Sequence, residues 1–379
     1  MKAGKSAIAS PLWVGFEGTS LPSEVSRWLA KGRIGGVVLY ARNIESPAQV
    51  RALCRGIRSS AGRGNPLPLI AVDQEGGRVA RFKEPPFTRF PPARACSLFC
   101  CRNETVAEAV GAATAAELRA VGIDIDFAPV LDVDSNPRNP VIGDRAFSDD
   151  PGAAATMGIA FAKGLLSRGI LPVGKHFPGH GDTSADSHKE LPVVRAGRET
   201  LLRRELLPFR RAARSGIPAL MTAHVMYPAL DRALPATLSR KILHDLLRER
   251  MRFRGTVFSD ALEMKAIADR YGLGEAAVLA VAAGCDVVLV CRGESAQAEA
   301  IDRLARETRD RPTFRRTLAA AAVRSGRLRD WAASKERCRP APRAVGAARH
   351  RRLSSLLREV WESTGRTSPA DISGNIGEG

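Results

Sequence analysis

Residues able to transfer protons are concentrated in one short stretch, KHFPGHGDTSADSH, which spans residues 175–188. It holds three histidines, one lysine and two aspartates among glycines and a proline, a composition typical of a loop. Asp186 and His188 lie two residues apart, so the carboxylate can hydrogen-bond one imidazole nitrogen and leave the other free. This pair could therefore act as a general acid/base.

Other interpretations of the same histidines compete with catalysis. His176 could be a structural residue at the end of a strand, and His180 could serve only to shape the turn. A metal-dependent hydrolase would instead use the set His176, His180, His188 and Asp182 as ligands. The GHGD segment lacks the helical two-histidine spacing of zinc proteases, and a metal site would give Asp260 no role.

Three further candidates follow short apolar runs. Asp73, in DQEGGR, is suited to grip vicinal hydroxyls, although the segment could also be a simple turn. Arg145 is suited to hold a polar ligand, or to form a surface salt bridge with Asp144. Asp260 is a candidate nucleophile, and the alternative is that it caps the helix after it, a role for which Ser259 is the better candidate.

Short apolar runs and helical segments alternate along the chain and predict the scaffold. The predicted strands are 11–16, 34–40, 67–72, 123–130, 169–174, 218–222, 255–258 and 286–291, and the predicted helices are 22–30, 46–57, 104–121, 151–169, 198–215, 239–250, 275–283 and 294–308. Eight such units predict an α/β fold, the (β/α)8 TIM barrel, as a single catalytic domain over residues 1–335. In this fold the functional residues gather at the C-terminal ends of the strands, which is where the polar clusters fall, His224 included. A doubly wound sheet would concentrate them near one crossover point.

Composition narrows the class of protein. The formal charge is +18, but arginine is spread along the chain and only 5% of residues are aromatic, so we expect no nucleic-acid partner. No run of about twenty apolar residues predicts a membrane span. Seven cysteines without a CxxC pair or zinc spacing favour reduced thiols in the cytoplasm, with no metal or other cofactor.

The last part of the chain differs from the rest. Residues 336–379 are rich in arginine, alanine and proline, and we expect a basic C-terminal extension. Within it, residues 353–361 could form a short amphipathic helix, and residues 364–379 are typical of disorder. A solvated tail with one docked helix is the favoured interpretation, and an arm that binds a partner or a surface is the alternative.

Several motifs together resemble glycoside hydrolase family 3. They are VDQEGGRVARF at 72–82, DFAPVLDV at 126–133, IGDRAF at 142–147, KHFPGHGDTSADSH at 175–188 and FSDALEM at 258–264. The resemblance covers roughly residues 10–300 and is strongest to the family's single-domain β-N-acetylhexosaminidases of the NagZ type. The CSLFCC stretch, residues 96–101, is a departure from the family's pattern.

The resemblance implies a role for each matching residue. It implies that Asp260 is the nucleophile of a retaining glycosidase, that His188 is the acid/base and that Asp186 is its dyad partner. It also implies a set of residues that hold an N-acetylglucosamine unit: Asp73, Arg81, Arg145, Lys175 and His176.

The implied activity is a retaining β-N-acetylhexosaminidase, active on terminal N-acetylglucosamine of peptidoglycan-derived muropeptides in cytoplasmic cell-wall recycling. No cofactor is implied, and a monomer is expected. Two-domain relatives resemble β-glucosidases and take their acid/base from a second domain, for which the roughly 80 residues after the last strand are too few. Other relatives with the histidine transfer the sugar to phosphate, so β-N-acetylglucosaminide phosphorylase and β-glucosidase remain alternatives within the family.

Overall fold

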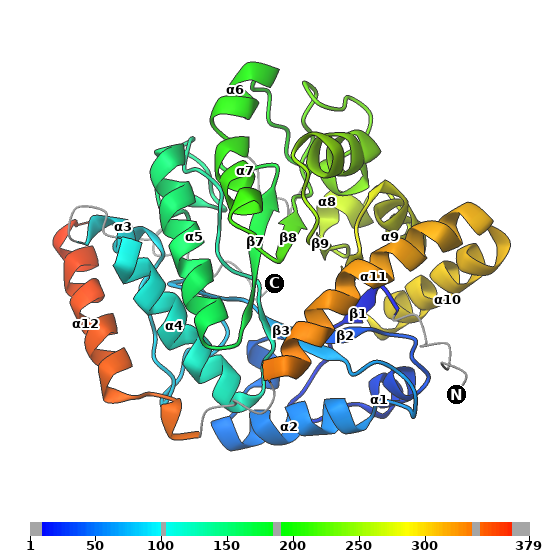
Figure 1. Ribbon diagram of the computed structural model, residues 1–379, viewed down its shortest axis with the longest axis horizontal. Coiled ribbons are helices and arrows are strands. Elements are labelled where there is room, and N and C mark those ends of the chain that lie inside the picture. The colour runs from blue at the N-terminus through cyan, green and yellow to red at the C-terminus, as the bar shows by residue number, and fades with distance from the viewer. Residues whose placement is uncertain (1–9, 100–103, 185–190, 336–341, 366–379) are drawn as a thin grey trace.

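The protein is a closed barrel of eight parallel strands surrounded by helices, as seen in a computed structural model that describes residues 10–99, 104–184, 191–335 and 342–365 (Figure 1). The barrel strands are β1 (Leu12–Val14), β2 (Gly36–Leu39), β3 (Leu69–Val72), β6 (Ile125–Asp126), β7 (Leu171–Phe177), β8 (Ala219–Thr222), β9 (Thr256–Ala261) and β10 (Val287–Val290). They follow one another around the barrel in sequence order, and β10 pairs with β1 to close it. The predicted (β/α)8 fold is confirmed.

Helices follow the strands on the outside of the barrel, and all but the last, α10, lie between two consecutive barrel strands. They are α1 (Ser23–Ala30), α2 (Pro47–Ser59), α3 (Arg94–Leu98), α4 (Glu104–Val121), α5 (Pro151–Ser167), α6 (Arg198–Arg203), α7 (Leu206–Arg214), η5 (Lys241–Arg250), α8 (Lys265–Ala268), α9 (Leu273–Ala283) and α10 (Glu294–Asp310). Short helical turns lie at η1 (Ala41–Asn43), η3 (Gly143–Arg145) and η4 (Ala236–Leu238). Ser46 caps α2 as predicted, because its side chain accepts a hydrogen bond from the Gln49 amide.

Several features differ from the predicted elements, among them the following three. The predicted helix 198–215 is two helices, α6 and α7, because the chain turns at Glu205, whose buried carboxylate accepts hydrogen bonds from Ser135 and Arg204. The DQEGGR segment forms a small antiparallel hairpin of β4 (Gln74–Gly76) and β5 (Val79–Ala80). A helix that was not predicted, α11 (Pro312–Lys335), follows α10.

Helix α11 closes the N-terminal end of the barrel. Its residues Leu328 and Ala332 belong to the same buried cluster as Trp13, Phe127 and Phe258, which fill the barrel interior. Figure 1 shows α11 crossing in front of β1 and β2. The barrel is therefore a packed core with one covered end, and its opposite end is the one at which the functional residues of this fold gather.

Two buried carboxylates fasten this covered end. Asp124, just before β6, contacts Arg58 and Arg119 at 2.7 and 3.3 Å. Asp286, just before β10, contacts Arg248 of η5 at 2.7 Å and Arg324 of α11 at 2.8 Å. Each aspartate also accepts a backbone amide from a neighbouring strand, so each links a strand start to the surrounding helices.

The C-terminal part of the described chain contains η7 (Pro342–Ala344) and the helix α12 (Ala348–Ser363), longer than the predicted segment 353–361. It packs beside α3 and α4 (Figure 1). Leu357 is fully buried there, and His350 Nδ1 lies 2.9 Å from the Glu117 carboxylate of α4. Predictions made for residues 366–379 fall outside the described residues.

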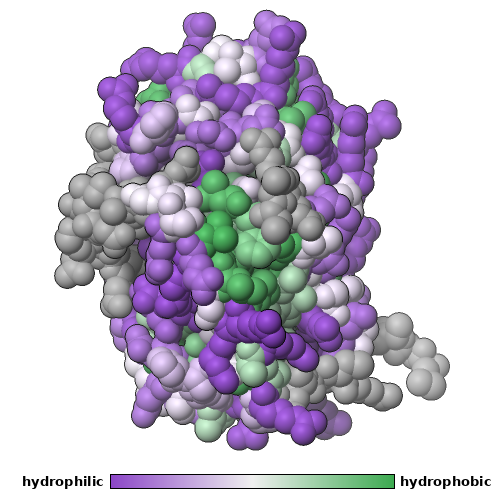
Figure 2. Space-filling view, turned by 90° about the vertical axis from the view of Figure 1, so that its left-hand side faces the viewer, coloured by the Kyte–Doolittle hydropathy of each residue, from purple (hydrophilic) through white to green (hydrophobic). Residues whose placement is uncertain are grey.

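Charged and polar side chains dominate one face of the molecule. Figure 2 shows the face at the left of Figure 1, where hydrophilic residues surround one hydrophobic area. No helix in the described segments is both long and apolar enough to cross a membrane.

Candidate active site

The predicted site residues converge on the C-terminal end of the barrel. Asp73 directly follows β3, Lys175 and His176 are near the end of β7, and Asp260 is near the end of β9. Because all barrel strands are parallel, these ends lie on the same side of the molecule. Arg145, in η3, reaches the same place from the loop before α5.

Lys175 lies at the centre of an ionic network. Its Nζ atom is 2.6 Å from Asp73 Oδ1 and 2.6 Å from Glu75 Oε1. On the other side of Asp73, the guanidinium of Arg81 lies 3.3 Å from Oδ2. Segments about 100 residues apart in sequence are therefore joined through one buried ammonium group.

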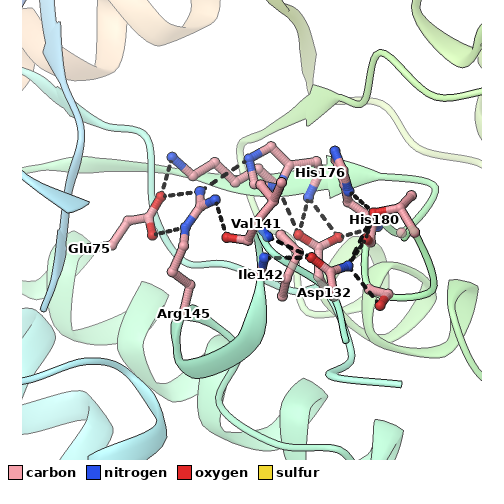
Figure 3. Close-up of polar contacts among 12 residues, drawn as sticks. Glu75, Asp132, Val141, Ile142, Arg145, His176 and His180 are labelled. Atoms are coloured by element: carbon pink, nitrogen blue, oxygen red, sulfur yellow. Dashed lines mark hydrogen bonds and ion pairs between the residues drawn. The ribbon is translucent and has the colours of Figure 1, made fainter. Parts of the chain in front are cut away.

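Arg145 extends this network through Glu75 (Figure 3). Its Nε and Nη2 atoms donate to the two Glu75 carboxylate oxygens at 2.9 and 2.8 Å, the bidentate geometry that suits a guanidinium. The alternative of a surface salt bridge from Arg145 to Asp144 is wrong, because Arg145 is buried and Asp144 pairs with Arg78 instead.

The charges of the network hold its members ionised. Burial alone would raise the pKa of Glu75, but Arg145 and Lys175 lower it well below its ordinary value. Burial likewise opposes a lowered pKa at Asp73, and Lys175 and Arg81 outweigh it. The pKa of Lys175 is raised, since its two carboxylate partners overcome desolvation. Near neutral pH the cluster therefore presents fixed charges to a ligand.

His176 is oriented by a buried aspartate that the sequence analysis did not single out. Its Nδ1 lies 2.6 Å from Asp132 Oδ2, and the backbone amides of His176 and His180 also donate to Asp132. This places a proton on Nδ1 and turns Nε2 towards Arg145, whose Nη2 lies 3.4 Å away (Figure 3). Burial favours the neutral form of Asp132, but the nearby His176 lowers its pKa.

Asp260 is placed as a charged side chain facing the same end. Burial would raise its pKa, but the positive potential of His224, His176 and Lys175 lowers it overall. Its Oδ1 accepts the Ala261 amide at 2.8 Å. Neither Asp260 nor Ser259 caps the helix that follows: α8 begins at Lys265, and Ser259 Oγ accepts the Leu289 amide inside the barrel wall. The cap interpretation is therefore wrong.

Two of the predicted catalytic residues, Asp186 and His188, lie outside the described residues. Of the remaining proposed metal ligands, Asp182 pairs with Arg204 at 2.8 Å. His180 is buried beside His176, and burial lowers its pKa to about 4. Within the described segments, no group of three histidine, cysteine or acidic side chains is arranged to hold a metal ion.

Comparison with known proteins identifies the family. The model of the glycosyl hydrolase family 3 N-terminal domain matches residues 13–317. The chain belongs to this family. A β-hexosaminidase from Alkalilimnicola ehrlichii is 46% identical over 288 residues, which are 75% of this chain and 81% of the relative.

Solved structures of family 3 members agree in fold. A glycoside hydrolase family 3 β-N-acetylglucosaminidase from Paenibacillus sp. str. FPU-7 superposes with a TM-score of 0.86 at 35% identity, covering 93% of this chain and 68% of that one. NagZ from Neisseria gonorrhoeae, in complex with N-trifluoroacetyl-D-glucosamine, superposes with a TM-score of 0.70 at 33% identity, covering 83% and 98%. As a family 3 member, the protein is a glycoside hydrolase.

The structure adds site residues that sequence reasoning did not name as such in this family 3 chain. Glu75 and Asp132 lie inside two of the motifs, DQEGGR and DFAPVLDV, but nothing in their spacing showed which carboxylate would face which cation. Glu263, three residues after Asp260, accepts the Cys291 amide at 2.9 Å, and its other carboxylate oxygen is buried without a hydrogen-bond partner among the described residues. Burial raises the pKa of Glu263 to about 7.

Proposed function

We propose that the protein is a retaining β-N-acetylhexosaminidase that removes terminal β-linked N-acetylglucosamine through a covalent intermediate on Asp260. The observation that carries this proposal is the placement of the ionised Asp260 at the same barrel end as the network of Asp73, Lys175 and Arg145. Relatives named β-hexosaminidase, at up to 46% identity over most of their length, support the substrate class.

The network supplies what a sugar-binding site needs. Charged groups that are already paired with one another keep their positions without a ligand, so little reorganisation is required when sugar hydroxyls bind. Asp73 offers carboxylate oxygens to hydroxyls, Arg81, Arg145 and Lys175 offer donors, and His176 offers the acceptor nitrogen Nε2. We assign these five residues to the N-acetylglucosamine unit.

In the first chemical step, a carboxylate oxygen of Asp260 attacks the anomeric carbon while the bond to the leaving oxygen breaks. The leaving oxygen takes a proton from His188, which Asp186 orients. In the second step His188 removes a proton from water, and the water oxygen displaces Asp260 from the anomeric carbon. Because the nucleophile must be anionic at the start, the lowered pKa of Asp260 supports its role.

The natural substrate we propose is a muropeptide released from peptidoglycan, processed in the cytoplasm during cell-wall recycling. This finer assignment rests on the NagZ-type motifs and on the likeness to NagZ of Neisseria gonorrhoeae. Four described cysteines are buried and free, which is compatible with a reducing compartment. We also propose that residues 1–335 are the catalytic domain and residues 336–379 an extension of it.

The test is hydrolysis of p-nitrophenyl β-N-acetylglucosaminide followed by NMR of the first product formed. A retaining enzyme releases the β anomer first, whereas an inverting one releases the α anomer. Asp260→Ala should abolish turnover, and added azide should restore release of p-nitrophenol from this variant with the α-glycosyl azide as product. His188→Ala should slow turnover strongly, because the deglycosylation step loses its base.

Matched assays separate the alternatives. Faster cleavage of the β-glucoside would identify a β-glucosidase, and a sugar phosphate formed in phosphate buffer would identify a phosphorylase. Activity lost with EDTA and restored by a divalent metal would overturn the mechanism in favour of a metal-dependent hydrolase. Release of N-acetylglucosamine from a purified muropeptide tests the natural substrate, and failure there alone would leave the glycosidase chemistry standing.

A further inference from the structure

A cavity of about 180 Å³ lies at the N-terminal end of the barrel, opposite the candidate active site. Its walls come from the segments that precede β1, β2 and β3, from the end of α1 and from α11. The polar part of the wall includes Ser10, Lys31, Asn65 and Arg329, and apolar residues such as Leu29 and Ile34 complete it.

The positive charge of Arg329 is not neutralised within the described parts of the chain. Its Nη2 donates to the Gly35 carbonyl at 2.9 Å, and its Nε is buried without a hydrogen-bond partner there. No described carboxylate lies within ion-pair distance of this guanidinium. Burial lowers the pKa of Arg329 to about 10, and only the exposed Asp330 acts in the opposite direction.

Other buried or half-buried arginines at the same end of the barrel are paired. Arg58 and Arg119 share Asp124, and Arg248 and Arg324 share Asp286. Arg329 is half-buried, and a partly desolvated guanidinium without a counter-charge loses hydration that an incoming anion would offset. Arg329 therefore differs from these arginines because no described carboxylate neutralises its charge, and such a guanidinium is available to bind an anion.

Negative potential from the end of α1 does not supply the missing charge. The last carbonyls of this helix are already used: Trp28 accepts from the Arg33 amide, Leu29 from the Gly32 amide and Ala30 from the Asn65 side chain. Lys31, the C-cap residue of α1, adds a second cation to the cavity wall. The cavity thus combines two cations with the polar side chains of Ser10 and Asn65, and no described acidic residue lies in its lining.

We propose that this cavity is a binding site for a small oxyanion, a molecule that carries a carboxylate or a phosphate group, held mainly by Arg329 with Lys31 as the second cation. A water molecule occupies about 30 Å³ of liquid, so the cavity has room for an anion of several heavy atoms. The site is separate from the sugar site, which lies at the other end of the strands.

The test is calorimetric titration of the full-length protein with inorganic phosphate and, separately, with acetate, at constant ionic strength set by chloride. We expect saturable binding of at least one of them. Arg329→Met should weaken it about tenfold or more, and Lys31→Met by a smaller factor. The matched control is Arg327→Met, which removes an exposed arginine from the same helix and should leave the affinity unchanged.

The outcomes are distinct. Tighter phosphate binding identifies a phosphate-bearing ligand, and tighter acetate binding identifies a carboxylate. Equal affinities in the wild type, Arg329→Met and Lys31→Met would place the anion elsewhere, for example at Lys175 and Arg145, and would overturn the proposal, as would no saturable binding of either probe. Since Lys31 is exposed, its variant tests the site even if Arg329→Met fails to fold.

Discussion

Buried carboxylates that each contact two cations occur at both ends of the barrel, but their electrostatic balance differs. At the C-terminal end, Lys175 and Arg145 outweigh burial and lower the pKa of Glu75. At the N-terminal end, Arg248 and Arg324 contact Asp286, yet burial dominates and raises its pKa. The surroundings of Glu75 therefore favour its ionised form, whereas those of Asp286 disfavour the ionised form of that side chain.

The cations that contact Glu75 and Asp286 differ in what else they contact. Lys175 also contacts Asp73, whose side chain keeps 14% of its surface exposed. Arg145 also approaches His176. The partners of Glu75 therefore contact further residues that can bind a ligand. Asp286 is fully enclosed and accepts the Val257 amide, so its contacts end within the scaffold. One cluster is built for recognition and the other fastens a strand to two helices.

The largest expected effect is on stability, from Asp286→Ala. The buried Arg248 and the half-buried Arg324 would lose their counter-charge, and removal of one member of such a group costs about 3–5 kcal/mol. Urea unfolding should show this loss, while kcat/KM per folded molecule stays unchanged. Asp302→Ala is the control, because it breaks an exposed pair with Arg33 and should cost below about 1 kcal/mol. A small effect at Asp286 would remove the distinction between the two ends.

An effect on activity is expected from Glu75→Gln. The amide would place an N–H group against Arg145 Nε, so Arg145 would lose one arm of its bidentate contact and Lys175 a charge partner. We expect kcat/KM per folded molecule for the N-acetylglucosaminide to fall roughly 100-fold, or about 2.7 kcal/mol, and stability to fall as well, because the lowered pKa of Glu75 means that its charge favours the folded state. The exposed Glu84→Gln is the control. An unchanged kcat/KM would mean that the network is structural.

An effect of opposite sign on stability is expected from Glu263→Gln. The folded pKa of about 7 exceeds the ordinary value of 4.5, so the folded state binds more protons than the unfolded state between these values. Stability therefore falls as pH rises from about 4.5 to about 7. The glutamine keeps an oxygen for the Cys291 amide but removes the buried charge.

Unfolding curves at pH 5 and pH 8 measure this effect. The variant should gain up to about 3 kcal/mol relative to the wild type at pH 8 and less at pH 5. Glu249→Gln, on the surface, should show no such pH dependence. A gain that is equal at both pH values would show that Glu263 is not held protonated by burial.

The barrel was predictable because each strand and most helices carry their own local pattern. Helix α11 was missed because it follows the eighth repeat and its apolar residues are separated by arginines along most of its length. The site residues in the motifs were predictable as types, since Asp73, Lys175, His176 and Asp260 fall at strand ends. The residues that contact them were not predictable. Glu75 contacts Arg145, 70 residues away in sequence, and Asp132 contacts His176, 44 residues away. Local spacing in the sequence does not indicate contacts over such separations.

The position of α11 also affects where a recombinant fragment of the barrel can end. The match to the family 3 model ends at residue 317, near the start of this helix, whereas Leu328 and Ala332 lie beyond it. A recombinant fragment trimmed to the family boundary would lose Leu328 and Ala332 from the cluster that holds Trp13 and Phe258, and would leave Asp286 without Arg324. We therefore expect such a fragment to be less stable than one that extends through α11, although both would keep the proposed sugar-binding residues.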